Sequence, residues 1–225
     1  MQQPIQNYIE HTLLRPDISD KDIENLIDEA IKYQFVGVCV PPYWAKKARR
    51  DIGKNPIQLV TVVGFPLGYS RSEVKLKEIE SALREGVNEL DVVVNISAIK
   101  TGMYGWVKAE IAQFAKMIHE QESFLKVILE TAYLNPQELE QTAKVCIDAG
   151  ADYLKTSTGF APTGAEISTV QRLRSLAPSH VGIKASGGIK TLTQTEAFIE
   201  AGAERIGTSA SIAIMEQWQE KIKHS

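Results

Sequence analysis

The stretch Ala149-Gly-Ala-Asp-Tyr-Leu-Lys155 indicates how this chain folds, because a glycine at the end of a helical pattern leads at once into a short apolar strand. The same step occurs at Glu85-Gly-Val-Asn-Glu-Leu-Asp91 and at Ala201-Gly-Ala-Glu-Arg-Ile-Gly207. Glycine suits the left-handed position just past a helix end. In each copy a chemically unusual residue stands five places after the glycine, so strands in equal register would bring Asp91, Lys155 and Gly207 to one side. The alternative is that the repetition is only the sequence habit of any βα repeat.

Strand and helix patterns alternate along the whole chain of 225 residues. Apolar runs bounded by turn residues predict strands at 11–14, 35–40, 58–65, 89–95, 125–131, 152–158, 181–186 and 205–209. Helical periodicity predicts a first helix that begins at Ser19 or Asp20, with further helices near 43–50, 71–85, 105–121, 136–149, 165–175, 192–200 and 211–223.

The central strands are apolar almost without alternation, as Leu90-Asp-Val-Val-Val94 and Lys126-Val-Ile-Leu129 show. This pattern is typical of parallel strands that are covered on both faces. We therefore predict an α/β fold in which residues 1–225 form one domain, a closed (βα)8 TIM barrel. An open, doubly wound sheet is the alternative, and it is disfavoured because no glycine fingerprint follows the first strand.

The composition limits the possible partners and the cellular compartment. Lys and Arg total 25 against 28 Asp and Glu, and the basic residues are scattered, so we expect no nucleic-acid partner. No stretch approaches the ~20 apolar residues that would span a membrane. The N-terminal residues lack the pattern of a signal peptide, and Cys39 and Cys146 lie far apart in apolar contexts, as expected of a reducing compartment. These features predict a cytoplasmic protein with no membrane partner.

Two lysines lie inside short apolar runs that end in glycine turns, Lys155 in Asp152-Tyr-Leu-Lys-Thr-Ser-Thr-Gly159 and Lys184 in Val181-Gly-Ile-Lys-Ala-Ser-Gly-Gly188. Burial and a second nearby ammonium both disfavour the charged form of a lysine, so such a pair could supply a neutral amine that attacks carbonyl groups. The alternative is that each lysine reaches from a strand end to water. The occurrence of two such lysines in one chain favours the reactive pair.

Glycine-bearing turns follow the sixth, seventh and eighth predicted strands, at Thr158-Gly159-Phe160, Ser186-Gly-Gly-Ile-Lys190 and Gly207-Thr-Ser209. Glycine allows the backbone to approach an anion closely, and in barrels a phosphate site often forms after strands seven and eight. We expect a small anionic ligand to be held by Gly187, Gly188, Gly207 and Ser209, with Gly159 at the rim and Lys190 as a countercharge. A single Gly-Gly pair is more often a plain turn.

Asp91 is a carboxylate in an apolar strand, and buried acids are rare unless they are paired. It could pair with one of the two lysines and pass protons through a water, or it could cap a neighbouring turn at the strand end. Glu130 presents a weaker case of the same kind. The four histidines, His11, His119, His180 and His224, show no metal-ligand spacing, so we expect no metal.

Over nearly its whole length the chain resembles the deoxyribose-phosphate aldolases, the acetaldehyde-dependent Schiff-base aldolases of the DeoC family. The matching stretches are Ile9-Glu-His-Thr-Leu-Leu14, Val38-Cys-Val-Pro-Pro42, Val63-Gly-Phe-Pro-Leu-Gly68, Glu89-Leu-Asp-Val-Val-Val-Asn95, Val127-Ile-Leu-Glu-Thr131, Lys155-Thr-Ser-Thr-Gly159 and Lys184-Ala-Ser-Gly-Gly188. Together these motifs are specific, whereas taken singly only the Lys155 segment is.

The resemblance implies a TIM barrel with no metal and no organic cofactor, and it implies roles for individual residues. Lys155 would form the Schiff base, Lys184 would lower its pKa and help to shuttle protons, and Asp91 would act in proton transfer. The substrate, a sugar phosphate that yields acetaldehyde, would contact Thr12, Cys39, Thr158, Gly159, Gly187, Gly188, Lys190, Gly207 and Ser209. A homodimer is also implied. Two positions depart from the family pattern: Glu10 stands where Asp is commoner, and Lys190 where Arg is common.

Two other functions fit parts of the sequence. Another Schiff-base barrel aldolase would share the lysine but act on a ketose phosphate. A non-catalytic barrel that binds a sugar phosphate would need only the glycine turns, although it leaves the two lysines unexplained.

Overall fold

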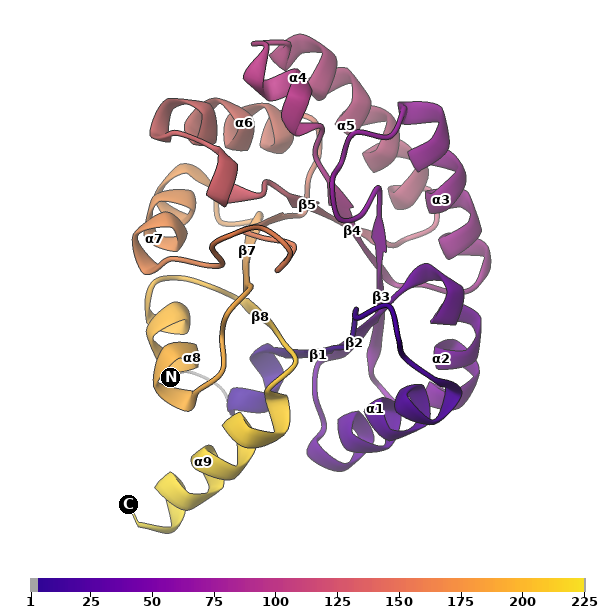
Figure 1. The fold of residues 1–225 in the computed structure, drawn as a ribbon, viewed down its shortest axis with the longest axis vertical. Coiled ribbons are helices and arrows are strands. Elements are labelled where there is room, and N and C mark those ends of the chain that lie inside the picture. Colours follow the sequence, from indigo (N-terminus) through magenta and orange to yellow (C-terminus); the bar gives the residue numbers. More distant parts are fainter. Residues whose placement is uncertain (1–3, 225) are drawn as a thin grey trace.

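Parallel strands close into a barrel in the computed structural model, which describes residues 4–224 (Figure 1). Each strand pairs with the next, and β1 also pairs with β8, so the sheet has no free edge. The strands are β1 (Ile9–Thr12), β2 (Gly37–Val40), β3 (Gln58–Val63), β4 (Glu89–Val93), β5 (Phe124–Ile128), β6 (Tyr153–Lys155), β7 (Gly182–Ser186) and β8 (Arg205–Thr208). The predicted closed barrel is confirmed, and the open sheet is not found.

Helices surround the strands as an outer ring, and α9 extends away from it (Figure 1). They are α1 (Asp20–Tyr33), α2 (Ala45–Ile52), α3 (Ser72–Arg84), α4 (Ile96–Lys100), α5 (Tyr104–His119), α6 (Pro136–Asp148), α7 (Ile167–Leu176), α8 (Leu192–Glu200) and α9 (Ser211–Lys223). Short 3-10 helices are η1 (Ile5–Tyr8), η2 (Pro42–Trp44) and η3 (Thr131–Tyr133). Within residues 4–224, no helix is both long and apolar enough to cross a membrane.

Side-chain caps and glycines set the ends of several helices. Ser19 caps α1 in a reciprocal arrangement with Asp22, which confirms the predicted start of the first helix. Gly86, Gly150 and Gly202 follow the ends of α3, α6 and α8 with φ values of 81°, 97° and 105°. These left-handed conformations are those predicted from the repeated sequence step, and each one turns the chain into the next strand.

The strands are buried on both faces. Every residue of β2, β4 and β7 is buried, with the outward side chains packed under the helices. The inward side chains include charged groups, among them Glu10, Asp91 and Lys184, which have no measurable exposure. The strand side chains that point outward are mostly apolar, so these charged side chains of the strands lie inside the barrel. There they must be paired with one another.

The first strand, predicted at 11–14, is Ile9–Thr12, and most other elements begin or end a few residues from their predicted bounds. Two further differences have a local cause. The strand predicted at 152–158 ends at Lys155, because the Thr158 N–H donates to the Glu130 carboxylate, 3.3 Å away, instead of continuing the ladder. The helix α4 was missed within the segment that follows the fourth strand. It is one short turn, and the Asn95 side chain caps it by accepting from the Ala98 N–H at 3.1 Å.

Candidate active site

Lys155 and Lys184 lie side by side on β6 and β7, where the strand register pairs them directly. Both amines donate to the same oxygen of Asp91 on β4: Lys155 Nζ and Lys184 Nζ are each 2.7 Å from Asp91 Oδ2. All three side chains are buried, with exposed fractions of 3% or less. The structure therefore brings together the three residues predicted to carry the chemistry, and neither lysine reaches away to bulk water.

Asp91 is held as a carboxylate by the cations around it. Burial alone would raise the pKa of its carboxyl, but the ammonium groups of Lys126, Lys155 and Lys184 outweigh burial and hold that pKa well below its usual value. The sequence suggested one lysine partner for Asp91, whereas the structure gives it three.

Lys126 is a third buried lysine that sequence reasoning passed over. Its amine lies 3.3 Å from Asp91 Oδ1 and 3.5 Å from Glu10 Oε1, and it also contacts the Glu89 carboxylate. Burial lowers the pKa of Lys126, but Asp91, Glu10 and Glu89 together raise it well above the ordinary value. The signal was present in the sequence, because Lys126 begins an apolar strand run just as Lys155 and Lys184 interrupt theirs.

Glu10 contacts two of these lysines, Lys126 and Lys184. One of its carboxylate oxygens contacts Lys184, and the other faces Lys126. Burial tends to raise the pKa of Glu10, but Lys126 and Lys184 bring it below the ordinary value. Burial likewise tends to lower the pKa of Lys184, but Asp91 and Glu10 bring it above the ordinary value. The sequence flagged Glu10 only as a departure from the family pattern.

The three lysines differ in how firmly carboxylates hold them. Lys126 contacts three acidic side chains and Lys184 contacts two, whereas Lys155 contacts Asp91 alone. Lys155 also lines a pocket that opens between the strand ends. It is thus the lysine that a carbonyl compound can reach, and it has the fewest carboxylate contacts to break.

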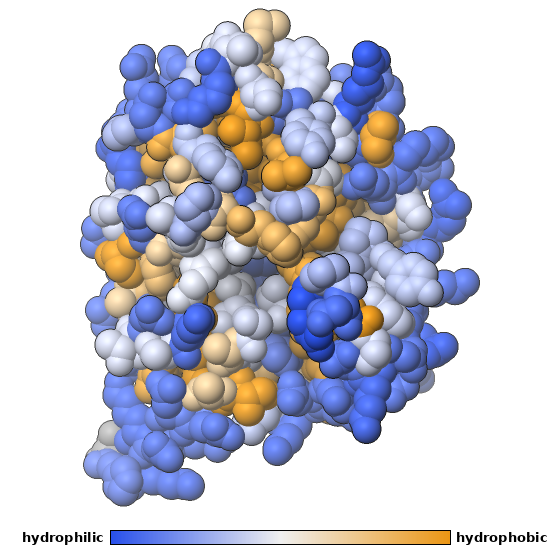
Figure 2. Space-filling model, viewed as in Figure 1, coloured by the Kyte–Doolittle hydropathy of each residue, from blue (hydrophilic) through white to orange (hydrophobic). Residues whose placement is uncertain are grey.

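The pocket has a volume of about 330 Å³ and lies at the ends of β1, β6, β7 and β8. Besides Lys155, the predicted substrate residues that line it are Thr12, Thr158, Gly159, Gly187, Gly188, Lys190, Gly207 and Ser209. In Figure 2 the face of the barrel is hollowed near its centre, and hydrophilic side chains gather at its periphery.

Gly187 and Gly188 form the turn after β7, with φ values of 90° and 78° that side chains rarely adopt. A Cβ on Gly187 would stand 3.0 Å from Gly164 Cα, whereas a Cβ on Gly188 would meet nothing within 4 Å. The first glycine is therefore required by packing as well as by conformation. The second leaves open space beside the backbone, as the approach of an anion requires.

Cys39 is the predicted substrate residue that is not among those lining the pocket. It is fully buried and packs with Val60 and Val62, with Leu14 against them. Burial raises the pKa of its thiol to about 11, so the group is a neutral thiol at physiological pH. Burial keeps the thiol protonated, so Cys39 is not a nucleophile here, and the charges of Lys184 and Asp91 lie close enough to act on it.

Glu130, the weaker of the two acidic candidates in the sequence, is buried. It positions the loop after β6. It accepts a hydrogen bond from the Thr158 hydroxyl as well as from the Thr158 N–H. Burial raises the pKa of its carboxyl. Glu130 thereby fixes Thr158, which lines the pocket three residues beyond Lys155. Across residues 4–224, no His, Cys, Asp and Glu side chains form a group of three that could hold a metal ion.

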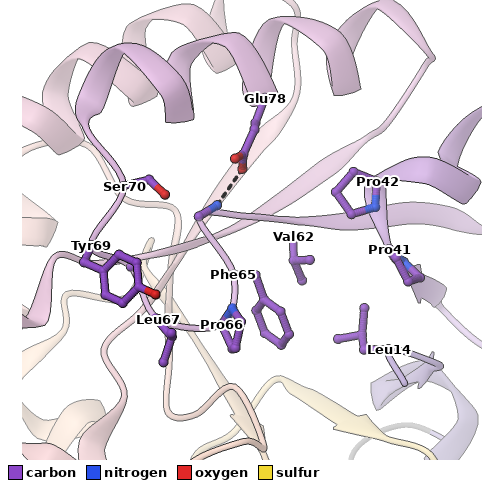
Figure 3. Close-up of a pocket in the computed structure, with 12 residues that line it drawn as sticks. Leu14, Pro41, Pro42, Val62, Phe65, Pro66, Leu67, Tyr69, Ser70 and Glu78 are labelled. Carbon is purple, nitrogen blue, oxygen red and sulfur yellow. Dashed lines mark hydrogen bonds between the residues drawn. The ribbon is translucent and has the colours of Figure 1, made fainter. Parts of the chain in front are cut away.

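A second hollow, of about 550 Å³, lies next to this pocket and shares Leu14 with it (Figure 3). Its walls are mostly apolar and include Pro41, Val62 and Phe65. The charged side chain in this wall, Glu78, points to the backbone of the loop and accepts from the Gly64 N–H at 2.6 Å. The hollow therefore offers an anion no cationic partner, and the lysine-lined pocket is the site to consider for a phosphate.

We expect Glu78→Ala to lower the free energy of unfolding by about 1–2 kcal/mol, because it leaves the part-buried Gly64 N–H without its acceptor. Glu78→Gln keeps an acceptor oxygen and should lose less than half of that. Urea denaturation of both variants measures the difference. Equal losses in the two variants would show that the hydrogen bond is not what stabilises the loop.

Comparison with known proteins gives a consistent result. The family model described as DeoC/LacD family aldolase matches residues 7–219. A deoxyribose-phosphate aldolase of Thermococcus gammatolerans is 45% identical over 214 residues, which cover 94% of this chain and 95% of that protein.

Solved structures agree with the sequence relatives. A structure described as "QR15, an Aldolase" is 40% identical, with a TM-score of 0.92 and 97% of each chain covered. The deoxyribose phosphate aldolase from Aeropyrum pernix, described as having a unique tetrameric structure, is 35% identical, with a TM-score of 0.90 and coverage of 96% of this chain and 92% of that one. On the family match and on these full-length likenesses, this chain belongs to the DeoC/LacD family of aldolases.

Proposed function

We propose that this enzyme reversibly cleaves 2-deoxy-D-ribose 5-phosphate into D-glyceraldehyde 3-phosphate and acetaldehyde, through a Schiff base on Lys155. The observation that carries the proposal is the position of Lys155: its amine is buried, contacts Asp91 alone among the acids, and lines the pocket. Relatives at 45% and 40% identity are named deoxyribose-phosphate aldolases, which supports the choice of substrate.

Bond cleavage begins when the neutral amine of Lys155 attacks the aldehyde carbon of the open-chain sugar. Loss of water from that adduct gives a protonated imine, which draws electrons from the C2–C3 bond. When the C3 hydroxyl loses its proton, that bond breaks, releasing glyceraldehyde 3-phosphate and leaving an enamine on the lysine. Protonation of the enamine carbon and hydrolysis of the imine then release acetaldehyde.

We infer that Asp91 and Lys184 take part in the proton transfers of these steps. Asp91 accepts hydrogen bonds from both amines through one oxygen. A change of charge on Lys155 therefore alters the electrostatic energy of Asp91 and of Lys184. We assign proton transfer to Asp91, acting through a water, with Lys184 as the cation that favours the neutral form of its neighbour. Positioned proton transfer of this kind typically contributes ~10²–10⁴ in rate.

The other end of the pocket is suited to the phosphate. Gly187, Gly188, Gly207 and Ser209 bring backbone close to the cavity, and Lys190 adds a positive charge. The helix α9 begins at Ser211, two residues after Ser209, so its N-terminal end adds a favourable dipole. We propose that these groups hold the 5-phosphate while the aldehyde reaches Lys155.

Trapping of the covalent intermediate tests the function. Incubation with acetaldehyde and borohydride, followed by peptide mass mapping, should place a reduced adduct on the peptide that contains Lys155. Dihydroxyacetone phosphate under the same conditions should give little adduct. A preference for the ketose phosphate would favour the other class of Schiff-base aldolase, and no adduct with any carbonyl compound would favour a sugar-phosphate-binding barrel.

The remaining expectations concern the setting of the enzyme. We propose that residues 1–225 act as one aldolase domain in a cytoplasmic homodimer. Cys39 and Cys146 are both unpaired and buried, which supports a reducing compartment. The tetramer described for the Aeropyrum pernix relative makes sedimentation analysis of the assembly worthwhile.

A further inference from the structure

Arg15 lines the same pocket as Lys155 and Lys190, on the chain that leaves β1. The strand β8 lies between β7 and β1, and His11 pairs with Thr208 in the register. The segments after β7, β8 and β1 are therefore three successive walls of one end of the pocket. They carry Lys190, Ser209 and Arg15 respectively.

The charges on these walls all have one sign. The pocket is lined by three cationic side chains, those of Arg15, Lys155 and Lys190, and none of its described lining residues is an aspartate or a glutamate. Lys155 is engaged by Asp91. Arg15 and Lys190, on either side of Ser209, are the two cations at the outer end of the pocket.

The guanidinium of Arg15 is held at the rim by Asp17, which precedes α1, and by Asp22 in the first turn of that helix. Its Nη1 donates to Asp17 at 2.8 Å, and its Nη2 donates to Asp22 at 2.9 Å. These contacts are exposed, with 46% of the Arg15 side chain and 73% of the Asp17 side chain accessible, so each is worth little. A phosphate dianion in the pocket can compete for the same fork, or use its remaining N–H groups.

We propose that Arg15 is a phosphate-binding residue that determines the preference for phosphorylated substrates, an inference that rests on the proposed function. The planar fork of arginine matches phosphate oxygens, and the lysine at position 190 lacks that geometry. Arg15 supplies from the β1 side the bidentate contact that Lys190 cannot make from the β7 side.

The test is the ratio of kcat/KM for 2-deoxyribose 5-phosphate to that for 2-deoxyribose. Arg15→Gln should lower this ratio about tenfold, and Arg15→Lys should fall between, because it keeps the charge without the fork. Arg50→Gln, which removes an exposed arginine on α2, should leave the ratio at its original value. A change of less than about twofold for Arg15→Gln would overturn the proposal.

Asp17→Asn should change the kcat/KM ratio in the opposite direction to Arg15→Gln, because it weakens the contact that holds the Arg15 Nη1 group. It should raise the ratio in the original chain and have no effect when combined with Arg15→Gln. A rise of the same size in both backgrounds would mean that Asp17 acts through its own charge, and would contradict phosphate binding by the Arg15 guanidinium.

Failure of the proposed function can be told apart from failure of this inference. If the unaltered enzyme cleaves neither sugar, the proposed function is wrong, and calorimetric titration with inorganic phosphate still tests Arg15. Weaker phosphate binding by Arg15→Gln than by Arg50→Gln would then support the inference, and equal binding would overturn it.

Discussion

Lys155→Ala should reduce turnover of 2-deoxyribose 5-phosphate by about 10⁴-fold or more, because it removes the buried amine that forms the imine. Lys190 is the other lysine among the described lining residues, and we assign it to the phosphate end of the pocket. Lys126 and Lys184 cannot take over that role. Each is fully buried and bound by at least two carboxylates, so neither presents its amine to the pocket. A coupled assay of glyceraldehyde 3-phosphate release measures the loss.

The fold should survive this substitution, which makes the loss interpretable. Asp91 keeps Lys126 and Lys184 as partners, so no carboxylate is left alone in the interior. Calorimetric titration of Lys155→Ala with the sugar phosphate should still show binding, since the phosphate contacts are intact. Lys77→Ala, which removes a lysine whose side chain is 79% exposed on α3, is the matched control and should retain full activity. Residual activity above about 1% in Lys155→Ala would contradict the assignment.

The sequence was sufficient to predict the barrel and the proximity of Lys155 to Lys184, for physical reasons visible at particular residues. An ammonium in an apolar strand has to be explained, and Lys155 and Lys184 both stood out for that reason. Equal spacing from Gly86 to Asp91 and from Gly150 to Lys155 predicted equal depth, and the 2.7 Å contact between Asp91 and Lys155 confirms it.

The rest of the charged interior depends on pairing across the barrel, which no local pattern reveals. Lys126 and Glu89 face each other because β4 and β5 are neighbours, and Glu10 joins them only because β1 points across the same interior. Side-chain placement was equally out of reach for Cys39: its position within an apolar run could not show whether the thiol lines the pocket. Strand ends were misjudged where a side chain, such as that of Glu130, replaces a ladder bond.

Lys184→Leu should reduce kcat at neutral pH by about 10²–10³-fold and move the rise of activity to higher pH. The sign follows from the charges. The pKa of Lys184 lies above its ordinary value because Asp91 and Glu10 outweigh burial, so Lys184 is an ammonium throughout the working pH range. Its positive charge opposes a second positive charge on the adjacent amine.

Removal of Lys184 acts twice in the same direction. It removes the repelling cation, and it leaves Asp91 Oδ2 to Lys155 alone, so the charged form of Lys155 is favoured on both counts. We therefore expect kcat/KM, measured from about pH 6 to 10, to show its acid limb displaced to higher pH. A profile whose midpoint is unaltered would remove Lys184 from this role.

Stability must be separated from chemistry in this variant, because Lys184 also contacts Glu10. Glu10 retains Lys126 as a partner, so we expect Lys184→Leu to lower the free energy of unfolding by about 3 kcal/mol, the lower end of the range for a broken buried ion pair. Lys126→Leu is the comparison: it removes a buried ammonium from Asp91 and Glu10, and from Glu89 as well, but not the one paired with Lys155 in the register. A loss of stability in Lys126→Leu at least as large as in Lys184→Leu, with the larger displacement of the pH profile in Lys184→Leu, would assign the tuning of the amine to its neighbour on β7.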